Sequence, residues 1–195
     1  MHKIEFGIQS ESNTNATISK GGVVVLNTSG TEPYSELLRE GEKVTLTAAS
    51  AQEHLEFAGW YMKNSGGHSA VLVSREATYT FEAPNSNVSY YALFKAKHEM
   101  IVEIDPAALH LSYSEATGKY LYQIGDTAPA FESIKAEMKN LLTGERVALE
   151  SNVGFLVDAS AFKADVAGVY TIYYICIEDP SAIYSIEVEV VAKAN

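Results

Sequence analysis

Apolar and polar residues alternate along much of the first half of the chain. Val44, Leu46 and Ala48 fall on one face of a period-2 segment, while Lys43 and Thr45 fall on the other. This alternation is typical of a strand with one buried face. On the same grounds, further strands are predicted at residues 4–8, 55–61, 77–83 and 88–94.

Trp60, the only tryptophan of the chain, lies in the predicted strand at residues 55–61. Strict alternation places Phe57 on one face of that strand and Trp60 on the other, so both faces need cover. A tryptophan in such a strand is expected to organise a core. The residues expected to form the structural core are Phe57, Trp60, Phe81 and Tyr170.

Three less regular signals precede Gly41. The polar run at residues 9–17 predicts a loop. The β-branched run at residues 23–26 predicts a strand that is buried on both faces. Residues 36–40 predict a single helical turn that ends at Gly41.

The second half of the chain also predicts strands, at residues 101–104, 120–123, 146–149, 169–177 and 183–191. Residues 131–142 fit both an amphipathic helix and a strand. We favour a strand at residues 134–140, because the hairpin turn signal Thr143-Gly144-Glu145 follows it directly. Several short strands at this spacing predict a β-sandwich.

A domain boundary is expected near residue 98, because residues 95–100 have the character of a linker. Residues 1–100 hold 8 Lys and Arg against 11 Asp and Glu, whereas residues 101–195 hold 6 against 14. Aspartate does not occur before Asp105. This change in composition predicts two domains, at residues 1–97 and 98–195, each of a usual size.

Five short motifs follow one another in the first half: Gly21-Gly22 with the valines after it, Glu40–Ala48, Phe57-Ala58-Gly59-Trp60, Tyr79-Thr80-Phe81 and Tyr91-Ala92-Leu93-Phe94. In this order, over about residues 1–96, they resemble the divergent internalin-type B repeat. The resemblance implies a small, grasp-like β domain, strung between extracellular modules of bacterial, mostly Gram-positive, surface proteins. It implies no catalytic residues. The long insertion between Asn27 and Glu40 departs from the usual pattern.

A second ordered set of motifs lies in the second half: Tyr122–Asp126, a charged hairpin around Gly144, Val157–Ser160, Ala167–Ile172 and Ile186–Val190. Over about residues 101–192 these motifs resemble a bacterial immunoglobulin-like domain. Asp165, Gly168 and Tyr170 stand where such domains carry their tyrosine corner. The resemblance implies a spacer or adhesion unit on a cell surface, or occasionally an accessory of a secreted glycosidase.

The formal net charge of the 195 residues is -11. Charge of this sign repels nucleic acid phosphates and anionic lipid, so neither is an expected partner, and it favours a soluble monomer. The sequence shows no apolar run of membrane-spanning length and no signal peptide. We therefore expect either a cytosolic protein or an excised piece of a longer one.

Candidate chemistry is sparse. The polar residues weighed as ligands are His2, His54, His68, His98, His110, Asp105, Asp126, Asp158, Asp165 and Asp179. The histidines lack metal-ligand spacing, and the aspartates fall at predicted turns, where solvated acids are favoured over calcium ligands. Cys176 is expected to be an inert buried thiol. Phosphate-loop, nucleophile-elbow and metal motifs are absent, so we expect no catalytic, cofactor-binding or metal-binding residues and no enzyme activity.

Adjacent aromatic residues occur at Trp60-Tyr61, Tyr90-Tyr91 and Tyr173-Tyr174. Neighbours in a strand face opposite ways, so one member of each pair is expected in the core, and the pair is not expected to form one stacking platform. Lys135 and Lys163 are candidates for a Lys–Asn amide crosslink of the kind that Gram-positive surface sandwiches sometimes carry.

The chain is therefore expected to be mainly β, with a small grasp-like β domain followed by an immunoglobulin-like β-sandwich. Its expected function is that of a non-enzymatic module of a bacterial cell-surface or secreted protein, a spacer or adhesion segment with a host or cell-wall ligand of protein or glycan nature. The first alternative is a carbohydrate-binding accessory of a secreted hydrolase, and the second is a cytosolic protein with an unrecognised active site. The expected localisation is extracellular, as a fragment without its signal peptide.

Overall fold

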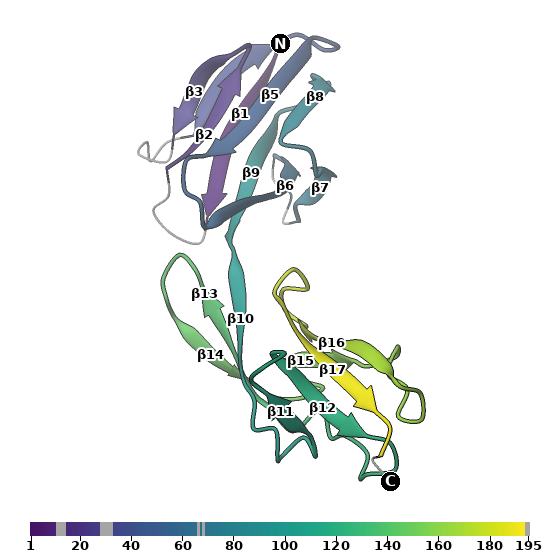
Figure 1. Ribbon diagram of the computed structural model, residues 1–195. Coiled ribbons are helices and arrows are strands. Elements are labelled where there is room, and N and C mark those ends of the chain that lie inside the picture. The colour runs from purple at the N-terminus through teal and green to yellow at the C-terminus, as the bar shows by residue number, and fades with distance from the viewer. Residues whose placement is uncertain (11–14, 28–32, 66, 68, 194–195) are drawn as a thin grey trace. The chain divides into compact units, whose positions relative to one another are not determined.

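The computed structural model describes residues 1–10, 15–27, 33–65, 67 and 69–193. Every regular element among them is a β-strand (Figure 1), which confirms the predicted mainly β class. The chain divides into two compact units, Met1–Lys97 and His98–Asn195. Parts of the loop predicted at residues 9–17 and of the insertion between Asn27 and Glu40 lie outside the described residues.

The first unit contains two sheets. Its strands are β1 (His2–Ser10), β2 (Ala16–Lys20), β3 (Val23–Asn27), β4 (Tyr34–Leu38), β5 (Lys43–Ser50), β6 (Leu55–Asn64), β7 (Val71–Ser74), β8 (Thr78–Glu82) and β9 (Val88–Ala96). One sheet has the order β4-β1-β9-β6-β7 and the other β3-β2-β5-β8. Strands β1 and β9 run parallel, and the other paired strands of the unit run antiparallel.

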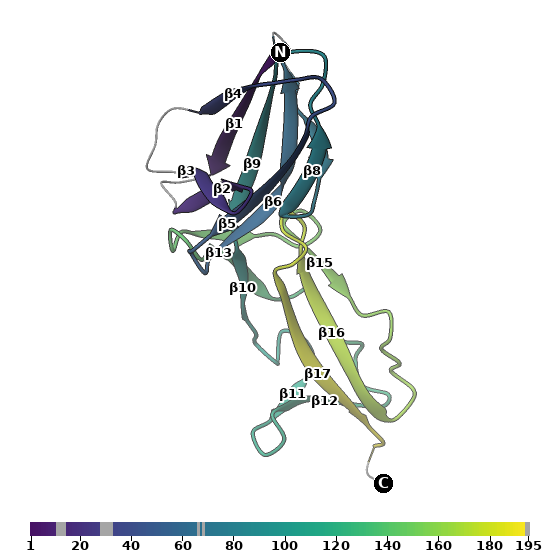
Figure 2. The ribbon, with the colours of Figure 1, turned by 90° about the horizontal axis from the view of Figure 1, so that it is seen from above.

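The core of the first unit lies between its two sheets, which Figures 1 and 2 show as separate layers. The ring of Phe81 on β8 lies 4.2 Å from the ring of Tyr90 on β9, centroid to centroid. Val44, Leu46 and Ala48 of β5 are buried while the alternate residues of this strand are exposed, which confirms the predicted faces.

The predicted placement of Trp60 opposite Phe57 is wrong. Phe57 pairs with Phe94 and Trp60 pairs with Ala92, two residues on the buried face of β9. The register shifts between Phe57 and Gly59, so one extra residue reverses the alternation of β6 at this point. Both aromatic rings therefore face the core.

Three other local predictions are corrected. Residues 36–40 do not form a helical turn, because β4 pairs with β1 at the edge of its sheet. Residues 23–26 form a strand, but it is an edge strand, and Val23 and Val24 are 67% and 54% exposed. The predicted linker at residues 95–100 is mostly strand, because β9 ends at Ala96 and the next strand begins at His98.

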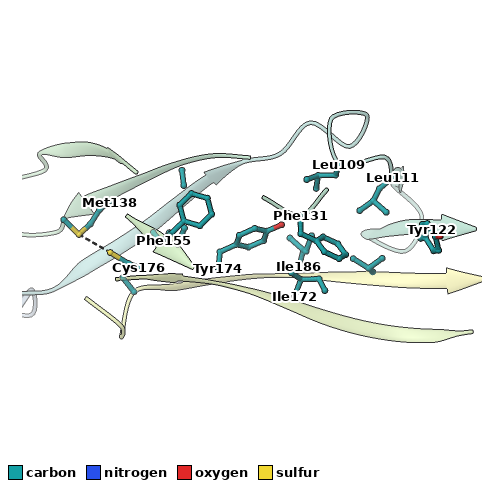
Figure 3. Packing of buried hydrophobic residues seen from close by; sticks show 14 of the residues in the cluster. Leu109, Leu111, Tyr122, Phe131, Met138, Phe155, Ile172, Tyr174, Cys176 and Ile186 are labelled. Atoms are coloured by element: carbon teal, nitrogen blue, oxygen red, sulfur yellow. Dashed lines mark hydrogen bonds between the residues drawn. The ribbon is translucent and has the colours of Figure 1, made fainter. Parts of the chain in front are cut away.

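The second unit also has two sheets, with the orders β10-β13-β14 and β11-β12-β17-β16-β15. Its strands are β10 (His98–Glu103), β11 (Ser112–Ser114), β12 (Lys119–Gln123), β13 (Lys135–Asn140), β14 (Arg146–Leu149), β15 (Phe155–Asp158), β16 (Gly168–Cys176) and β17 (Ile183–Val191). Strand β13 confirms the preference for a strand over a helix at residues 134–140. Met138 of the first sheet and Ile172, Tyr174 and Ile186 of the second belong to one buried cluster (Figure 3).

Candidate functional site

The four predicted core residues differ in burial. Trp60 is fully buried, and its indole Nε1 donates a hydrogen bond to the carbonyl oxygen of Ala77 at 3.1 Å. Phe81 is also buried. Phe57 is half-buried, with its ring edge-on to that of Trp60 and 5.9 Å away between centroids.

Tyr170, the fourth residue, is half-buried and packs against the core of the second unit. Its hydroxyl donates a hydrogen bond to the carbonyl oxygen of Val166, four residues upstream, at 3.0 Å. A hydrogen bond from a tyrosine hydroxyl back to a nearby upstream carbonyl is the geometry of a tyrosine corner. Gly168 lies beside this ring, and a Cβ there would make only an ordinary contact with the hydroxyl, at 3.5 Å.

One member of each adjacent aromatic pair is buried, as predicted, namely Trp60, Tyr90 and Tyr174. The remaining members of the first two pairs meet across strands, a contact that the sequence pattern did not predict. Tyr61 on β6 stands opposite Tyr91 on β9, and their rings stack at 5.7 Å between centroids with 11° between planes. The alternation of each strand alone could not show this. To predict this contact, one would need to know that residues 55–64 pair with residues 88–96 and that the register shifts before Gly59.

The stacked tyrosines lie on what we term the outer face, the face of sheet β4-β1-β9-β6-β7 opposite its buried side. This face carries Lys3, Glu5, Gly7, Ser89, Tyr91, Tyr61 and Lys63. Strand register places them in rows: Glu5, Ser89 and Lys63 form one row across β1, β9 and β6, and Gly7, Tyr91 and Tyr61 form the next.

A cavity of about 360 Å³ opens at the first of these rows. We call it the outer-face cavity, and its polar lining includes Lys3, Glu5, Lys63, Asn64, Asn87 and Ser89. The Glu5 carboxylate accepts hydrogen bonds from the ammonium group of Lys3 at 2.7 Å and from the Ser89 hydroxyl at 3.1 Å. Lys3 and Ser89 lower the pKa of Glu5, which keeps this carboxyl ionised.

A second cavity, of about 380 Å³, lies in the second unit beside His98, Met100 and Ile183. The Nδ1 atom of His98 lies 2.9 Å from an Asp179 carboxylate oxygen. Burial acts to raise the pKa of Asp179, but hydrogen bonds from Ser181 and His98 outweigh it, so the pKa lies below its usual value. The contacts with His98 and Ser181 therefore favour the ionised form of the Asp179 carboxyl group.

The aspartates predicted at turns mostly serve their own loops. The carboxylates of Asp158 and Asp179 each accept hydrogen bonds from the backbone N–H and the hydroxyl of a serine two residues on, and Asp105 accepts one from the N–H of Ala107. In the described part of the chain, no three His, Cys, Asp or Glu side chains come close enough to hold a metal ion. His68 lies outside that part.

Cys176 is fully buried, and its Sγ lies 3.6 Å from the sulfur of Met138 (Figure 3), which confirms the prediction of a buried thiol. The two lysines considered for an amide crosslink lie on the surface instead. Lys163 is exposed, and Lys135, whose side chain is 80% exposed, pairs with the carboxylate of Glu103 rather than with an asparagine.

Comparison with known families gives a match that lies almost wholly in the first unit. Residues 11–98 match the divergent InlB B-repeat domain. The match ends beside the boundary between the two units and agrees with the resemblance seen in the motifs of the first half. This B-repeat family is typical of surface proteins.

The second unit has the architecture of a sandwich, and its immunoglobulin-like character stays a prediction. No curated protein matches the chain. Over the residues that the structure describes, no helix has the length and apolar character of a membrane span.

Proposed function

We propose that the chain is a non-enzymatic segment of a bacterial cell-surface or secreted protein, where it serves as a spacer and adhesion module. The B-repeat match of the first unit supports a place among surface proteins. The burial of Cys176 supports a non-enzymatic role for that thiol, because a substrate cannot reach it.

The pairing of the first and last strands of the B-repeat unit carries the proposal of a spacer. Strands β1 and β9 run parallel and side by side, from the pair Ile4 and Val88 to the pair Ser10 and Phe94. Because parallel strands start at the same end of a sheet, a pull on residues 1 and 97 draws β1 and β9 past each other. All hydrogen bonds of this ladder are then loaded together, and a ladder loaded in this way resists extension.

Single-molecule force spectroscopy tests this role. In one geometry the chain is pulled through its two ends, and in the other through handles at residues 1 and 85, which peels β1 from β9 one pair at a time. The B-repeat unit is expected to unfold at a clearly higher force in the first geometry. Equal unfolding forces in the two geometries would contradict the role of a spacer that resists extension.

A carbohydrate-binding accessory of a secreted hydrolase is the second candidate function. The stacked rings of Tyr61 and Tyr91 beside the outer-face cavity favour it, because aromatic faces next to hydrogen-bonding groups suit sugar rings. Binding of the whole chain to immobilised glycans, and its loss on Tyr91→Ala, would support this function. Binding that persists in Tyr91→Ala would count against it.

A further inference from the structure

We propose that the outer-face cavity of the B-repeat unit binds a sugar unit that carries a carboxylate. This inference supplies a ligand for the adhesion part of the proposed function, while the spacer part does not depend on it. It is carried by three features of the cavity: its charge, its hydrogen-bonding groups and the ring beside it.

The charge of the cavity differs from that of the chain. Its lining holds two lysines and one glutamate, in a chain with a net charge of -11. Glu5 is already engaged by Lys3 and Ser89. Lys63, by contrast, forms no ion pair with an acidic side chain of the described residues. The ammonium group of Lys63 is therefore available to an anionic group of a ligand.

The hydrogen-bonding groups suit the hydroxyls of a sugar. The side-chain oxygen of Asn87 accepts the backbone N–H of Lys3 at 2.8 Å, which orients the amide and leaves its NH₂ group to donate. Asn64 adds a second amide to the lining. A volume of about 360 Å³ is near the small end of ligand pockets, so the cavity has room for one sugar unit of a longer chain.

The row of the outer face next to the cavity supplies an aromatic ring with an open side. Tyr91 stacks on Tyr61 toward β6, and its neighbour on the other side, in β1, is Gly7, which has no side chain. A Cβ at Gly7 would lie 3.7 Å from the Cβ of Tyr91, an ordinary contact. Gly7 therefore leaves a slot beside the ring of Tyr91, where the C–H face of a sugar can meet the electron-rich face of the ring.

A carboxylate-bearing sugar can come from a uronic acid polymer or from a sialylated host glycan. Calorimetric titration of the whole chain with a galacturonic acid tetramer and with sialyllactose separates these sources. The methyl-esterified tetramer and lactose are the neutral counterparts. At least one acidic probe is expected to bind, more tightly than its neutral counterpart, and its affinity is expected to fall as salt is added.

Two variants locate the site. Lys63→Gln is expected to weaken binding of the acidic probe about tenfold. Gly7→Leu is expected to abolish it by filling the slot beside Tyr91. Lys95→Gln is the matched control, because Lys95 is exposed on the same face of β9, two rows beyond Tyr91, and carries the same charge. This control is expected to bind as the unchanged chain does.

Several outcomes would overturn the inference: no binding of either acidic probe, equal binding of acidic and neutral probes, or equal losses in Lys63→Gln and Lys95→Gln. Tryptophan fluorescence shows whether Gly7→Leu is folded. If Gly7→Leu does not fold, the comparison of Lys63→Gln with Lys95→Gln still tests the inference. The spacer role is judged separately, by the pulling experiment.

Discussion

The imidazole Nδ1 of His98 lies 2.9 Å from a carboxylate oxygen of Asp179, a residue 81 positions further along the chain. His98 is the first residue of β10, and Asp179 lies in the loop between β16 and β17. Their side chains are only 16% and 15% exposed. The contact therefore ties the first strand of the second unit to the hairpin that closes it.

This contact predicts a loss of stability in acid. Because the pKa of Asp179 is lowered in the folded state, its contribution is complete above the pKa of the unfolded chain, about 4, and is lost as the pH falls through the folded-state value. Asp179→Asn is expected to cost about 1 to 2 kcal/mol at neutral pH. The difference in unfolding free energy between Asp179→Asn and the unchanged chain should disappear in acid. Thermal unfolding followed by circular dichroism measures this difference.

The control for this prediction is Asp105→Asn, which alters an exposed loop carboxylate that accepts a hydrogen bond from Ala107. At neutral pH, Asp105→Asn is expected to lower the free energy of unfolding by less than Asp179→Asn does. A gap between Asp179→Asn and the unchanged chain that stays constant down to about pH 2 would show that the charge of Asp179 does not contribute to stability.

Trp60 predicts an optical signal that reports on one unit alone. It is the only tryptophan and is fully buried in the first unit, so its emission should be blue-shifted in the folded chain and should move to the red when that unit unfolds. Asp179→Asn should lower the unfolding midpoint seen by circular dichroism while leaving the fluorescence midpoint in place. A parallel shift of both midpoints would mean that the two units unfold together.

Gly59 is predicted to be irreplaceable in β6. Its φ of +149° lies in a region that favours glycine, and a Cβ there would lie 2.6 Å from a methyl carbon of Leu72 and 3.1 Å from the carbonyl oxygen of Ser74. Gly59→Ala should destabilise the first unit by about 2 to 4 kcal/mol, measured by denaturant titration with tryptophan fluorescence.

Gly7→Ala is the matched control for Gly59→Ala. Gly7 lies in β1 of the same sheet, where a Cβ would make only an ordinary contact at 3.7 Å. This substitution should be neutral or slightly stabilising, because it reduces the freedom of the unfolded chain. Similar losses for both variants would refute the special role of Gly59.

Two tyrosines of β16 are predicted to respond in opposite ways to the loss of their hydroxyl. The hydroxyl of Tyr174 is buried without a hydrogen-bond partner among the described residues, and burial raises its pKa. Figure 3 shows its ring between those of Phe155 and Phe131. Tyr174→Phe should therefore leave stability unchanged or raise it by up to about 1 kcal/mol.

Tyr170→Phe removes the hydroxyl that binds the carbonyl oxygen of Val166 and should cost about 1 kcal/mol. In a unit of this size, a loss of about 1 kcal/mol lowers the melting temperature by about 4 to 8 °C. If Tyr174→Phe proves the more damaging of the two, its hydroxyl has a partner of its own, such as a buried water.

The sequence pattern correctly predicted those parts of the fold that depend on a single strand or a single turn. The faces of β5 follow from strict alternation, and β13 follows from the hairpin signal beside it. The hydrogen bond of Tyr170 is also local, spanning four residues. In each case the information lies within a short stretch of sequence.

The wrong or missing predictions share one cause. Each depends on the position of a strand within its sheet and on the strands that it pairs with. Val23 and Val24 are intrinsically suited to a strand, but only the strand order reveals that β3 has a neighbour on one side. Pairing with β1 makes residues 36–38 a strand despite their helical composition. Tyr61 and Tyr91 meet because of the register of β6 with β9, which lies outside any single-strand pattern.

Cys176 makes the molecule convenient for site-specific labelling. It is the sole cysteine of the chain and is fully buried beside Met138. A cysteine introduced at a surface position would then be the one sulfhydryl that a maleimide dye reaches in the native protein. A fluorophore can thus be placed at a chosen point of either unit while the native Cys176 stays in place.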